Sequence, residues 1–279
     1  MNPRRDSNWW GWGDPGVEPR LDDAALATLR ERVGELEPWP LAAELERFEL
    51  PAAEPLPRAL IDAVGEANVF AGAEDRLRHA TGRGYADLAR LRGGRLDAAP
   101  DAVLLPPDAD AVGRVLAVCA AEGIAVVPFG GGTSVVGGLE PLRGAHSRLV
   151  SLDLAALRQV RVDRRSLTAR LGAGLRGPEA EAALKAEGVV LGHYPQSFEY
   201  ATIGGFAATR SSGQSSSGYG RFDSMVVRLR LATPVGMLEL GRAPASAAGP
   251  DLRQLALGSE GALGVITSVT VRVRPLPDV

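Results

Sequence analysis

Three consecutive glycines at positions 130–132 constrain this chain more than any other feature of its sequence. They follow the apolar run 124–127, which is typical of a buried strand, and precede Thr133 and Ser134. Glycine adopts positive φ angles at no steric cost and leaves backbone N–H groups unshielded, so such a run can curl into an anion-binding nest. The two hydroxyls add hydrogen-bond donors. The loop therefore suits a diphosphate, whose charge is spread over several oxygens.

The glycine run does not match the two best-known phosphate-binding motifs. No Gly-Lys-[Ser/Thr] follows it, which excludes a Walker A loop. Val135 stands where a dinucleotide fingerprint would carry its third glycine, and no helix clearly begins there. A tight glycine turn that binds nothing is the alternative explanation at this point.

The rest of the composition narrows the chemistry that the chain can perform unaided. It contains one cysteine, Cys119, and histidines only at positions 79, 146 and 193, so we expect neither an intrachain disulfide nor a metal site. A net charge of −3 argues against a nucleic-acid partner. Difficult chemistry would therefore need an organic cofactor, or carboxylates and hydroxyls alone.

Length and hydropathy predict an ordinary globular protein. The 279 residues are 45% hydrophobic and 23% charged, which is enough to bury a substantial core. No apolar run reaches the roughly 18 residues that span a bilayer, and the first residues lack the apolar core of a signal peptide. We expect a cytoplasmic protein without a transmembrane segment, and a homodimer is compatible with the sequence.

Residues 1–97 form a helical lead segment in our interpretation. They hold all four tryptophans, and prolines interrupt their short helical stretches. Helices are expected from Asp22 to the prolines at 38 and 40, over 58–64, and in two pieces over 74–91 with a break at 82–84. One face of the first helix should pack, because its apolar positions recur at helical spacing: Leu26, Leu29, Val33 and Leu36.

Residues 98–279 predict an α+β domain. A strand at 102–105, a helix capped by Asp108 and closed by Gly123, and the strand at 124–127 form a βαβ unit. Further strands are expected at 159–162, 167–171, 189–191, 227–231, 237–240 and 269–273, with a helix over 178–187. Because hairpins accompany the βαβ unit, we predict α+β and not a doubly wound parallel sheet.

Two further loops rich in small residues stand near strand ends. The stretch 192–220 is rich in Ser and Gly, yet a turn at Thr202 leads into a short helix expected over 206–210. Its small residues and hydroxyls would let the backbone approach a flat aromatic ring. The stretch 258–264 leads into the last strand. Taken by itself, a glycine-rich stretch before a strand marks only a β-bulge. Because it is the third loop of this kind in the chain, we interpret the three loops as parts of one binding site.

Four ordered pieces of sequence carry a family resemblance: 10–13 (Trp-Gly-Trp-Gly), 128–134, 197–210 and 258–267. Together they resemble the FAD-binding domain of the vanillyl-alcohol-oxidase or p-cresol methylhydroxylase (PCMH) type. More narrowly, they resemble the alkyldihydroxyacetonephosphate synthase family. The resemblance covers the whole chain, and it implies a two-lobed PCMH-type FAD-binding domain preceded by the helical N-terminal segment.

The resemblance also assigns FAD-binding residues to the three loops. The pyrophosphate would be held by Pro128, Phe129, Gly130, Gly131, Gly132, Thr133 and Ser134. The flavin and its ribityl-diphosphate linker would be lined by Gln196, Ser197, Phe198, Glu199, Tyr200, Ala201, Thr202, Thr209, Arg210, Ser211 and Ser212. Backbone contacts with the adenosine and isoalloxazine side of the cofactor would come from Glu260, Gly261, Ala262, Leu263, Gly264, Val265 and Ile266. The pyrophosphate loop lacks the histidine to which covalent relatives attach FAD, so we expect non-covalent binding.

The reaction implied by the resemblance is the exchange of the acyl group of acyl-dihydroxyacetone phosphate for a long-chain alcohol in ether-lipid synthesis. The substrate would thus be a small or lipid-like molecule. Family members continue into a substrate-capping domain that supplies much of the active site, so the catalytic acid–base residues stay unassigned. Two alternatives remain open: an FAD-dependent dehydrogenase of a D-2-hydroxy acid such as lactate or glycolate, and an FAD-binding module without catalysis of its own.

Single residues in the loops carry competing explanations. His193 is the one candidate proton carrier, although a histidine bonded to a turn backbone is the favoured explanation. Arg210 suits either a phosphate or a salt bridge within the serine-rich loop. Glu260, between glycines, fits a loop-organising carboxylate better than a base. Cys119 should be a core residue, and the N-terminal tryptophans should dock their arm onto the core.

Overall fold

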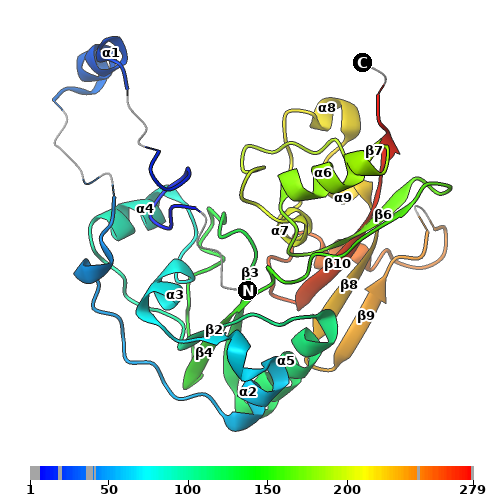
Figure 1. The fold of residues 1–279 in the computed structure, drawn as a ribbon, viewed down its shortest axis with the longest axis horizontal. Helices are drawn as coiled ribbons and strands as arrows, with labels where there is room; N and C mark the ends of the chain where they lie inside the picture. Colours follow the sequence, from blue (N-terminus) through cyan, green and yellow to red (C-terminus); the bar gives the residue numbers. More distant parts are fainter. Residues whose placement is uncertain (1–6, 18–20, 36–39, 41, 244–245, 278–279) are drawn as a thin grey trace.

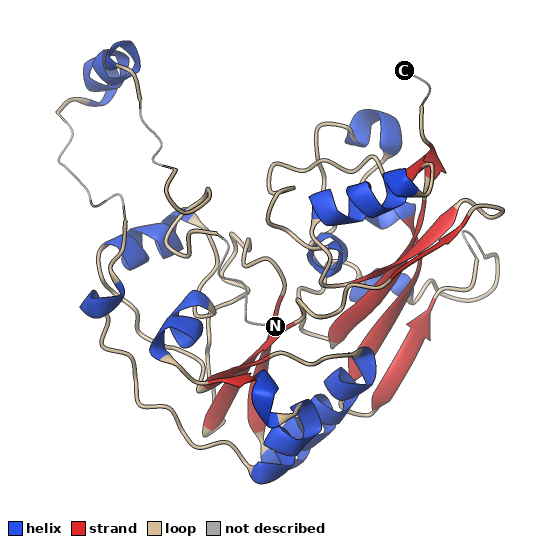
Figure 2. Cartoon of the chain, in the orientation of Figure 1, coloured by secondary structure: helices blue, strands red, loops and turns tan. Residues whose placement is uncertain are grey.

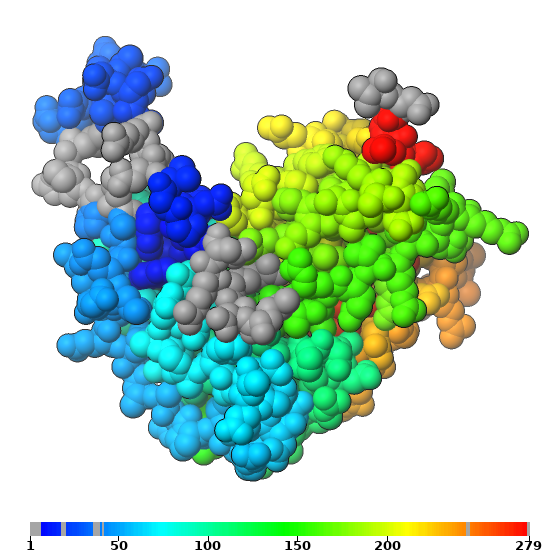
Figure 3. Space-filling view, in the orientation of Figure 1, coloured from blue at the N-terminus to red at the C-terminus, as the bar shows by residue number. Residues whose placement is uncertain are grey.

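The computed structural model describes residues 7–17, 21–35, 40, 42–243 and 246–277. The chain folds into two lobes, each built on its own sheet (Figure 1). Helices lie around both sheets, and the space-filling view shows the molecule hollowed between the N-terminal part and the part coloured green to yellow (Figures 2 and 3). This mixture of a parallel and an antiparallel sheet confirms the α+β class.

The first lobe contains a four-stranded sheet in the order β1-β2-β4-β3. Strands β2, β4 and β3 are parallel, and β1 pairs with β2 in antiparallel fashion. The strands are β1 (Val69–Phe70), β2 (Ala102–Leu104), β3 (Ile124–Phe129) and β4 (Arg148–Asp153). The helices of this part of the chain are α1 (Asp23–Val33), α2 (Arg58–Val64), α3 (Ala73–Arg78), α4 (Tyr85–Arg92) and α5 (Ala109–Glu122), with 3-10 turns at Leu45–Arg47 and Glu66–Asn68.

Helix α5 is built as its sequence predicts. The Asp108 carboxylate accepts a hydrogen bond from the Ala111 N–H at 2.7 Å, and Gly123 ends the helix in the left-handed region at φ 63°. The apolar stripe of α5 is buried against α2 and the sheet, and it includes Cys119. Helix and strand thus place the glycine loop at the carboxyl end of β3.

The second lobe contains a five-stranded antiparallel sheet in the order β5-β6-β10-β8-β9. The strands are β5 (Val160–Asp163), β6 (Thr168–Gly172), β8 (Val226–Thr233), β9 (Gly236–Leu240) and β10 (Val265–Arg272), with β7 (Val189–Val190) and β11 (Arg274–Pro275) paired separately. The helices are α6 (Gly177–Ala186), α7 (Ile203–Ala208), α8 (Ser216–Tyr219), α9 (Phe222–Met225) and α10 (Arg253–Ala256). Phe206 and Phe222 lie at the centre of its core.

Two expectations from the sequence are wrong. Helix α1 buries none of its residues, and it stands apart from the rest of the chain (Figure 1), so its apolar face packs against no described residue; Leu36 and Pro38 lie outside the described residues. The short helix expected over 206–210 instead begins at Ile203, because the Thr202 hydroxyl accepts a hydrogen bond from the Gly205 N–H at 3.2 Å and so caps it. The first error concerns long-range packing, and the second concerns the position of a local cap.

The division at residue 97 stays a prediction. Helix α2 packs into the core of the first lobe and β1 pairs with β2, although both precede that boundary. None of the helices in the described parts of the chain combines the length and apolarity needed to cross a membrane.

Capping provides a test of how much each helix contributes to global stability. Replacement Asp108→Ala should lower the free energy of unfolding by about 1 kcal/mol, because α5 packs on both sheets and loses its N-cap acceptor. Replacement Asp22→Ala removes the same kind of cap, a 2.7 Å bond to the Ala25 N–H, from a helix that buries nothing. Urea unfolding followed by circular dichroism should therefore shift for the first variant only, and equal shifts would contradict this structure.

Candidate cofactor site between the lobes

The glycine loop lies on an aromatic floor. The Phe129 ring, at the end of β3, packs against the His79 imidazole with 4.2 Å between ring centroids. Gly132 sits above that ring at φ +71°, and a β-carbon there would come within 2.8 Å of Phe129 Cζ. Only glycine fits this position, both for its backbone angle and for its distance from the ring. Phe129 therefore supports the loop from below and does not line the cavity described next.

The break between α3 and α4 holds the loop from the side. The Arg83 N–H donates to the Ser134 carbonyl oxygen at 2.7 Å. A β-carbon at Gly82 would overlap that same carbonyl, and one at Gly84 would lie 3.0 Å from the carbonyl oxygen of Val135. The sequence predicted the break at 82–84, but nothing in it indicated that the break touches the glycine loop.

The loop also meets the second lobe backbone to backbone. A β-carbon at Gly131 would overlap the carbonyl oxygen of Tyr200, and one at Gly130 would lie 2.5 Å from the Thr202 hydroxyl oxygen. Gly261, at φ +88°, approaches the ring of Pro128 in the same way. Side chains at these glycines would force the lobes apart, so the three loops converge because their contact positions carry none.

A cavity of about 360 Å³ lies where the three loops converge. Fifteen of the residues assigned from the sequence line it: Pro128, Gly130, Gly131, Gly132, Thr133, Ser134, Ser197, Ala201, Thr202, Thr209, Ser211, Glu260, Gly261, Gly264 and Ile266. Its size falls within the range of small-molecule sites. Hydroxyl groups from both lobes supply many of its polar atoms, which suits a ligand with many oxygens.

The loop offers backbone donors that the protein itself does not use. Within the part of the chain that the structure describes, the N–H groups of Gly131, Gly132 and Thr133 donate no hydrogen bond. Unpaired N–H groups carry a free-energy cost unless a ligand or water accepts from them. A diphosphate has the oxygens to satisfy such a row. The residues present therefore fit the pyrophosphate of FAD.

Glu260 is the only acidic or basic side chain among the described residues that line the cavity. It is one of three non-glycine residues with positive φ, at +47°. Its carboxylate reaches the first lobe, since a β-carbon at Gly138 would lie 2.9 Å from Glu260 Oε2. The cavity thus offers hydroxyls and backbone N–H groups for binding but little for proton transfer.

The remaining sequence-assigned residues do not line the cavity: Phe129, Gln196, Phe198, Glu199, Tyr200, Arg210, Ser212, Ala262, Leu263 and Val265. Several of them pack against neighbouring residues of the fold. Phe198 fills the space above Gly177 and packs on Tyr194, and Val265 is buried in the core of the first lobe. Period-two alternation along a strand explains the last case, because Ile266 faces the cavity and its neighbour does not.

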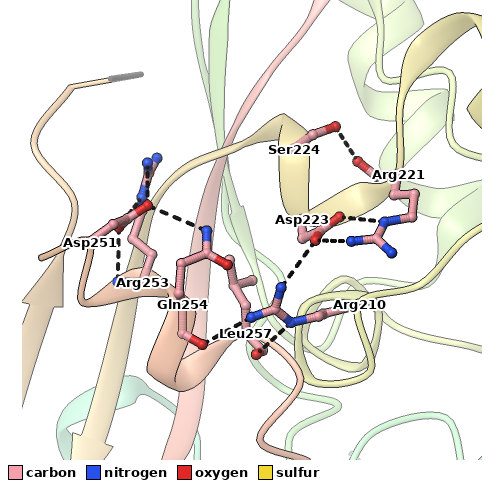
Figure 4. A network of polar contacts seen from close by, with 8 residues as sticks. All are labelled: Arg210, Arg221, Asp223, Ser224, Asp251, Arg253, Gln254 and Leu257. Atoms are coloured by element: carbon pink, nitrogen blue, oxygen red, sulfur yellow. Dashed lines mark hydrogen bonds and ion pairs between the residues drawn. The ribbon is translucent and has the colours of Figure 1, made fainter. Parts of the chain in front are cut away.

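Arg210 belongs to a structural network and not to the cavity (Figure 4). Its guanidinium donates to the Leu257 carbonyl oxygen at 3.0 Å and the Gln254 carbonyl oxygen at 3.0 Å, and it pairs with Asp223 at 3.3 Å. Asp223 is shared with Arg221 at 2.7 Å. The pair with Asp223 is a salt bridge of the kind the sequence allowed, and it ties the serine-rich stretch 192–220 to the helix that follows it.

His193 is buried behind the cavity wall. Its ring packs against Phe206 and Phe222, and its Nε2 is 2.9 Å from the hydroxyl of Ser211, which lines the cavity. Burial lowers the pKa of His193 to about 4, so the ring is neutral at pH 7. His193 does not itself line the cavity but contacts two residues that do, Phe206 and Ser211, and this placement gives no support to a direct proton carrier.

The N-terminal tryptophans dock onto the core, as expected. The Arg83 guanidinium packs against the rings of both Trp12 and Tyr200, at 5.2 and 5.1 Å from their centroids. The Tyr200 hydroxyl donates to Asp14 at 3.2 Å. The arm thereby links the break at 82–84 in the first lobe to the second lobe beside the glycine loop.

Sequence reasoning missed nine residues that line the cavity: Val135, Val136, Gly138, Leu139, Leu154, Gly204, Gly205, Phe206 and Ala208. Most continue the assigned loops by a few positions, so longer segment boundaries would have found them. Leu154 carries no local signal, because it reaches the cavity only through the pairing of β4 with β3.

The buried histidine predicts a pH dependence of stability. Burial lowers the pKa of His193 from its ordinary value of 6.5 to about 4 in the folded chain. Between these two pH values the unfolded chain therefore binds a proton at His193 that the folded chain does not bind. Stability should therefore fall as the pH drops from about 6.5 towards 4. Thermal unfolding at pH 7 and pH 5 should show a smaller difference for His193→Gln, whereas His146→Gln leaves His193 in place and should keep the wild-type difference.

Similar proteins share this arrangement. An FAD-binding domain family model matches residues 100–241. The alkyldihydroxyacetonephosphate synthases of Trypanosoma brucei brucei and Dictyostelium discoideum are 35% and 40% identical over 97% and 72% of this chain. The chain spans 48% and 33% of their lengths. A solved alkyldihydroxyacetonephosphate synthase structure superposes with a TM-score of 0.87 and 31% identity, covering 99% of this chain and 54% of its own.

The family model covers half of the chain, including β2 to β9 and the glycine loop. The chain therefore belongs to the FAD-binding domain family, and FAD is its cofactor.

Proposed function

We propose that this chain is the FAD-binding part of an alkyldihydroxyacetonephosphate synthase, an enzyme of ether-lipid synthesis that exchanges an acyl group for a long-chain alcohol. The observation that carries the proposal is likeness over 97% of the chain to a synthase, together with a cavity built from the same three loops. A cytoplasmic location and a homodimer remain predictions of the sequence.

The residues of the chain divide the binding task between the lobes. The N–H groups at 131–133 and the Thr133 and Ser134 hydroxyls would hold the diphosphate. The hydroxyls of Ser197, Thr202 and Ser211 would orient the rest of the cofactor from the second lobe. No histidine or cysteine is present among the described residues that line the cavity, which supports non-covalent binding.

Bound FAD supplies a redox-active isoalloxazine ring, and the chain supplies its placement. Val135 and Val136 line the cavity and remain 63% and 69% exposed, so water reaches this side. Water in a site weakens the electrostatic devices that catalysis uses. With Glu260 as the single acidic or basic lining residue, we infer that the acid–base groups and the substrate cover come from parts of the enzyme outside this chain.

Cofactor binding should depend on the glycine contacts. Replacement Gly131→Ala should weaken FAD binding by about tenfold or more, because the added methyl overlaps the Tyr200 carbonyl oxygen and pushes the loops apart. Gly218→Ala adds the same methyl in open space and should bind like the wild type. Quenching of flavin fluorescence during titration measures both dissociation constants.

A milder variant separates loss of binding from loss of folding. Thr133→Val keeps the shape of the side chain and removes one hydroxyl from the cavity, so the affinity should fall about tenfold while the unfolding midpoint stays unchanged. Wild-type affinity in both Gly131→Ala and Thr133→Val would contradict the assignment of this loop.

Catalysis should require more than the 279 residues. We expect the isolated chain to bind FAD and to incorporate no labelled long-chain alcohol from acyl-dihydroxyacetone phosphate, whereas the full-length enzyme containing it does so. Anaerobic addition of D-lactate or glycolate should leave the flavin absorbance unbleached. Bleaching would favour the hydroxy-acid dehydrogenase instead, and turnover by the isolated chain would refute the division of labour proposed here.

A further inference from the structure

A second cavity of about 240 Å³ lies where the N-terminal end of α5 meets the five-stranded sheet. It shares no lining residue with the cofactor cavity. Adjacent residues of β10 separate the two, because Ile266 lines the first and Thr267 lines the second. The lining residues Arg170 and Arg230 alternate along their strands with Leu171 and Leu231, which belong to the core on one face of the sheet, so this cavity opens on the opposite face.

Arginines from three strands line this second cavity: Arg161 of β5, Arg170 of β6 and Arg230 of β8. Arg161 and Arg170 are direct cross-strand partners in the β5–β6 ladder. Like charges directly opposite each other destabilise a sheet. The Arg161 guanidinium makes no hydrogen bond or ion pair with any described residue, and Arg170 donates one bond, from Nε to the Ser268 hydroxyl at 3.2 Å. Most of their donors are therefore available to a ligand.

Arg230 brings a third guanidinium into the same space. Its Nε is buried and donates no hydrogen bond within the described residues. The nearest carboxylate oxygens belong to Glu239 and Asp110, at 3.4 and 3.6 Å, and the Asp110 side chain is 75% exposed. Asp108 also lines the cavity, but its carboxylate is bound to the Ala111 N–H as the cap of α5. The carboxylates therefore leave the three arginines incompletely paired.

We propose that this cavity binds a small molecule through a phosphate group. Guanidinium groups bind phosphate oxygens through paired N–H donors, which a carboxylate partner at 3.4 Å or more does not satisfy here. The hydroxyls of Thr267 and Ser268 line the same cavity and add neutral hydrogen-bonding groups. The volume accommodates a phosphate, a pyrophosphate or a small phosphate ester. A bound phosphate would also neutralise the Arg161–Arg170 repulsion, so its binding would stabilise the fold.

Isothermal titration calorimetry in phosphate-free buffer tests this proposal with three probes: inorganic phosphate, pyrophosphate and glycerol 3-phosphate. The wild-type chain, loaded with FAD so that the first cavity is filled, should bind at least one probe, and that probe should raise the unfolding midpoint. Citrate serves as a polycarboxylate of similar charge and should not bind. The preferred probe distinguishes a free phosphate from a phosphate ester.

Matched variants test the direction in which the phosphate affinity should change. The double variant Arg161→Gln/Arg170→Gln should weaken phosphate binding at least tenfold, and Arg165→Gln, at the turn of the same hairpin but outside the cavity, should not. Asp110→Asn removes a lining negative charge and should tighten binding, a gain that a purely structural role would not produce. Unchanged FAD affinity verifies that each variant is folded.

Three outcomes would overturn the proposal: no probe binds the wild type, citrate binds as well as phosphate, or the double variant binds like Arg165→Gln. The result does not depend on the proposed synthase activity, since the probes report on a cavity that the cofactor does not share. If FAD itself fails to bind, the same titrations on the chain without FAD, with circular dichroism as the folding control, still decide the question.

Discussion

The site depends on a single steric condition: two backbones from different lobes must approach closer than any side chain allows. Gly130 and Gly131 meet Tyr200 and Thr202 at distances where a β-carbon would collide. That contact fixes the separation of the lobes and leaves the cavity beside it. It also explains why the glycines occur as a run, since Gly132 must in addition take a positive φ above the Phe129 ring.

The contact is reinforced from a part of the chain that carries no chemistry of its own. Arg83 donates its N–H to the glycine loop and packs its guanidinium against both Trp12 and Tyr200, so one residue joins the N-terminal arm, the loop and the second lobe. Beneath the loop, the His79 ring supports Phe129 while its Nδ1 bonds the Asp75 carbonyl oxygen at 2.7 Å and its Nε2 lies 3.2 Å from the Asp153 carboxylate. A rigid surround of this kind lets unpaired backbone donors persist until a ligand accepts from them.

Prediction from sequence succeeded where the cause is local. A cap such as Asp108 or Gly123 acts within a few residues, so the ends of α5 were readable, as were the glycine loop and the hairpins. It failed where burial depends on distant partners. The apolar stripe of α1 predicts packing, yet no described residue covers it. The sequence left two roles open for Arg210, and its ion pair with Asp223 and its bonds to two carbonyl oxygens join segments that only the fold brings together.

The sequence by itself predicted the cofactor and the loops proposed to hold it, because four motifs occur in the order of a known family. Only the tertiary structure decided which side chains face the cavity. Neighbours in sequence differ in this respect: Ile266 lines the site and Val265 does not, and His193 contacts the lining residues Ser211 and Phe206 without lining the cavity itself. The arginines of the second cavity are spread over three strands, and only the pairing of those strands brings them together. Strand pairing and the contact between the lobes decide which side chains face a cavity. Both are long-range properties, so no local sequence pattern predicts them.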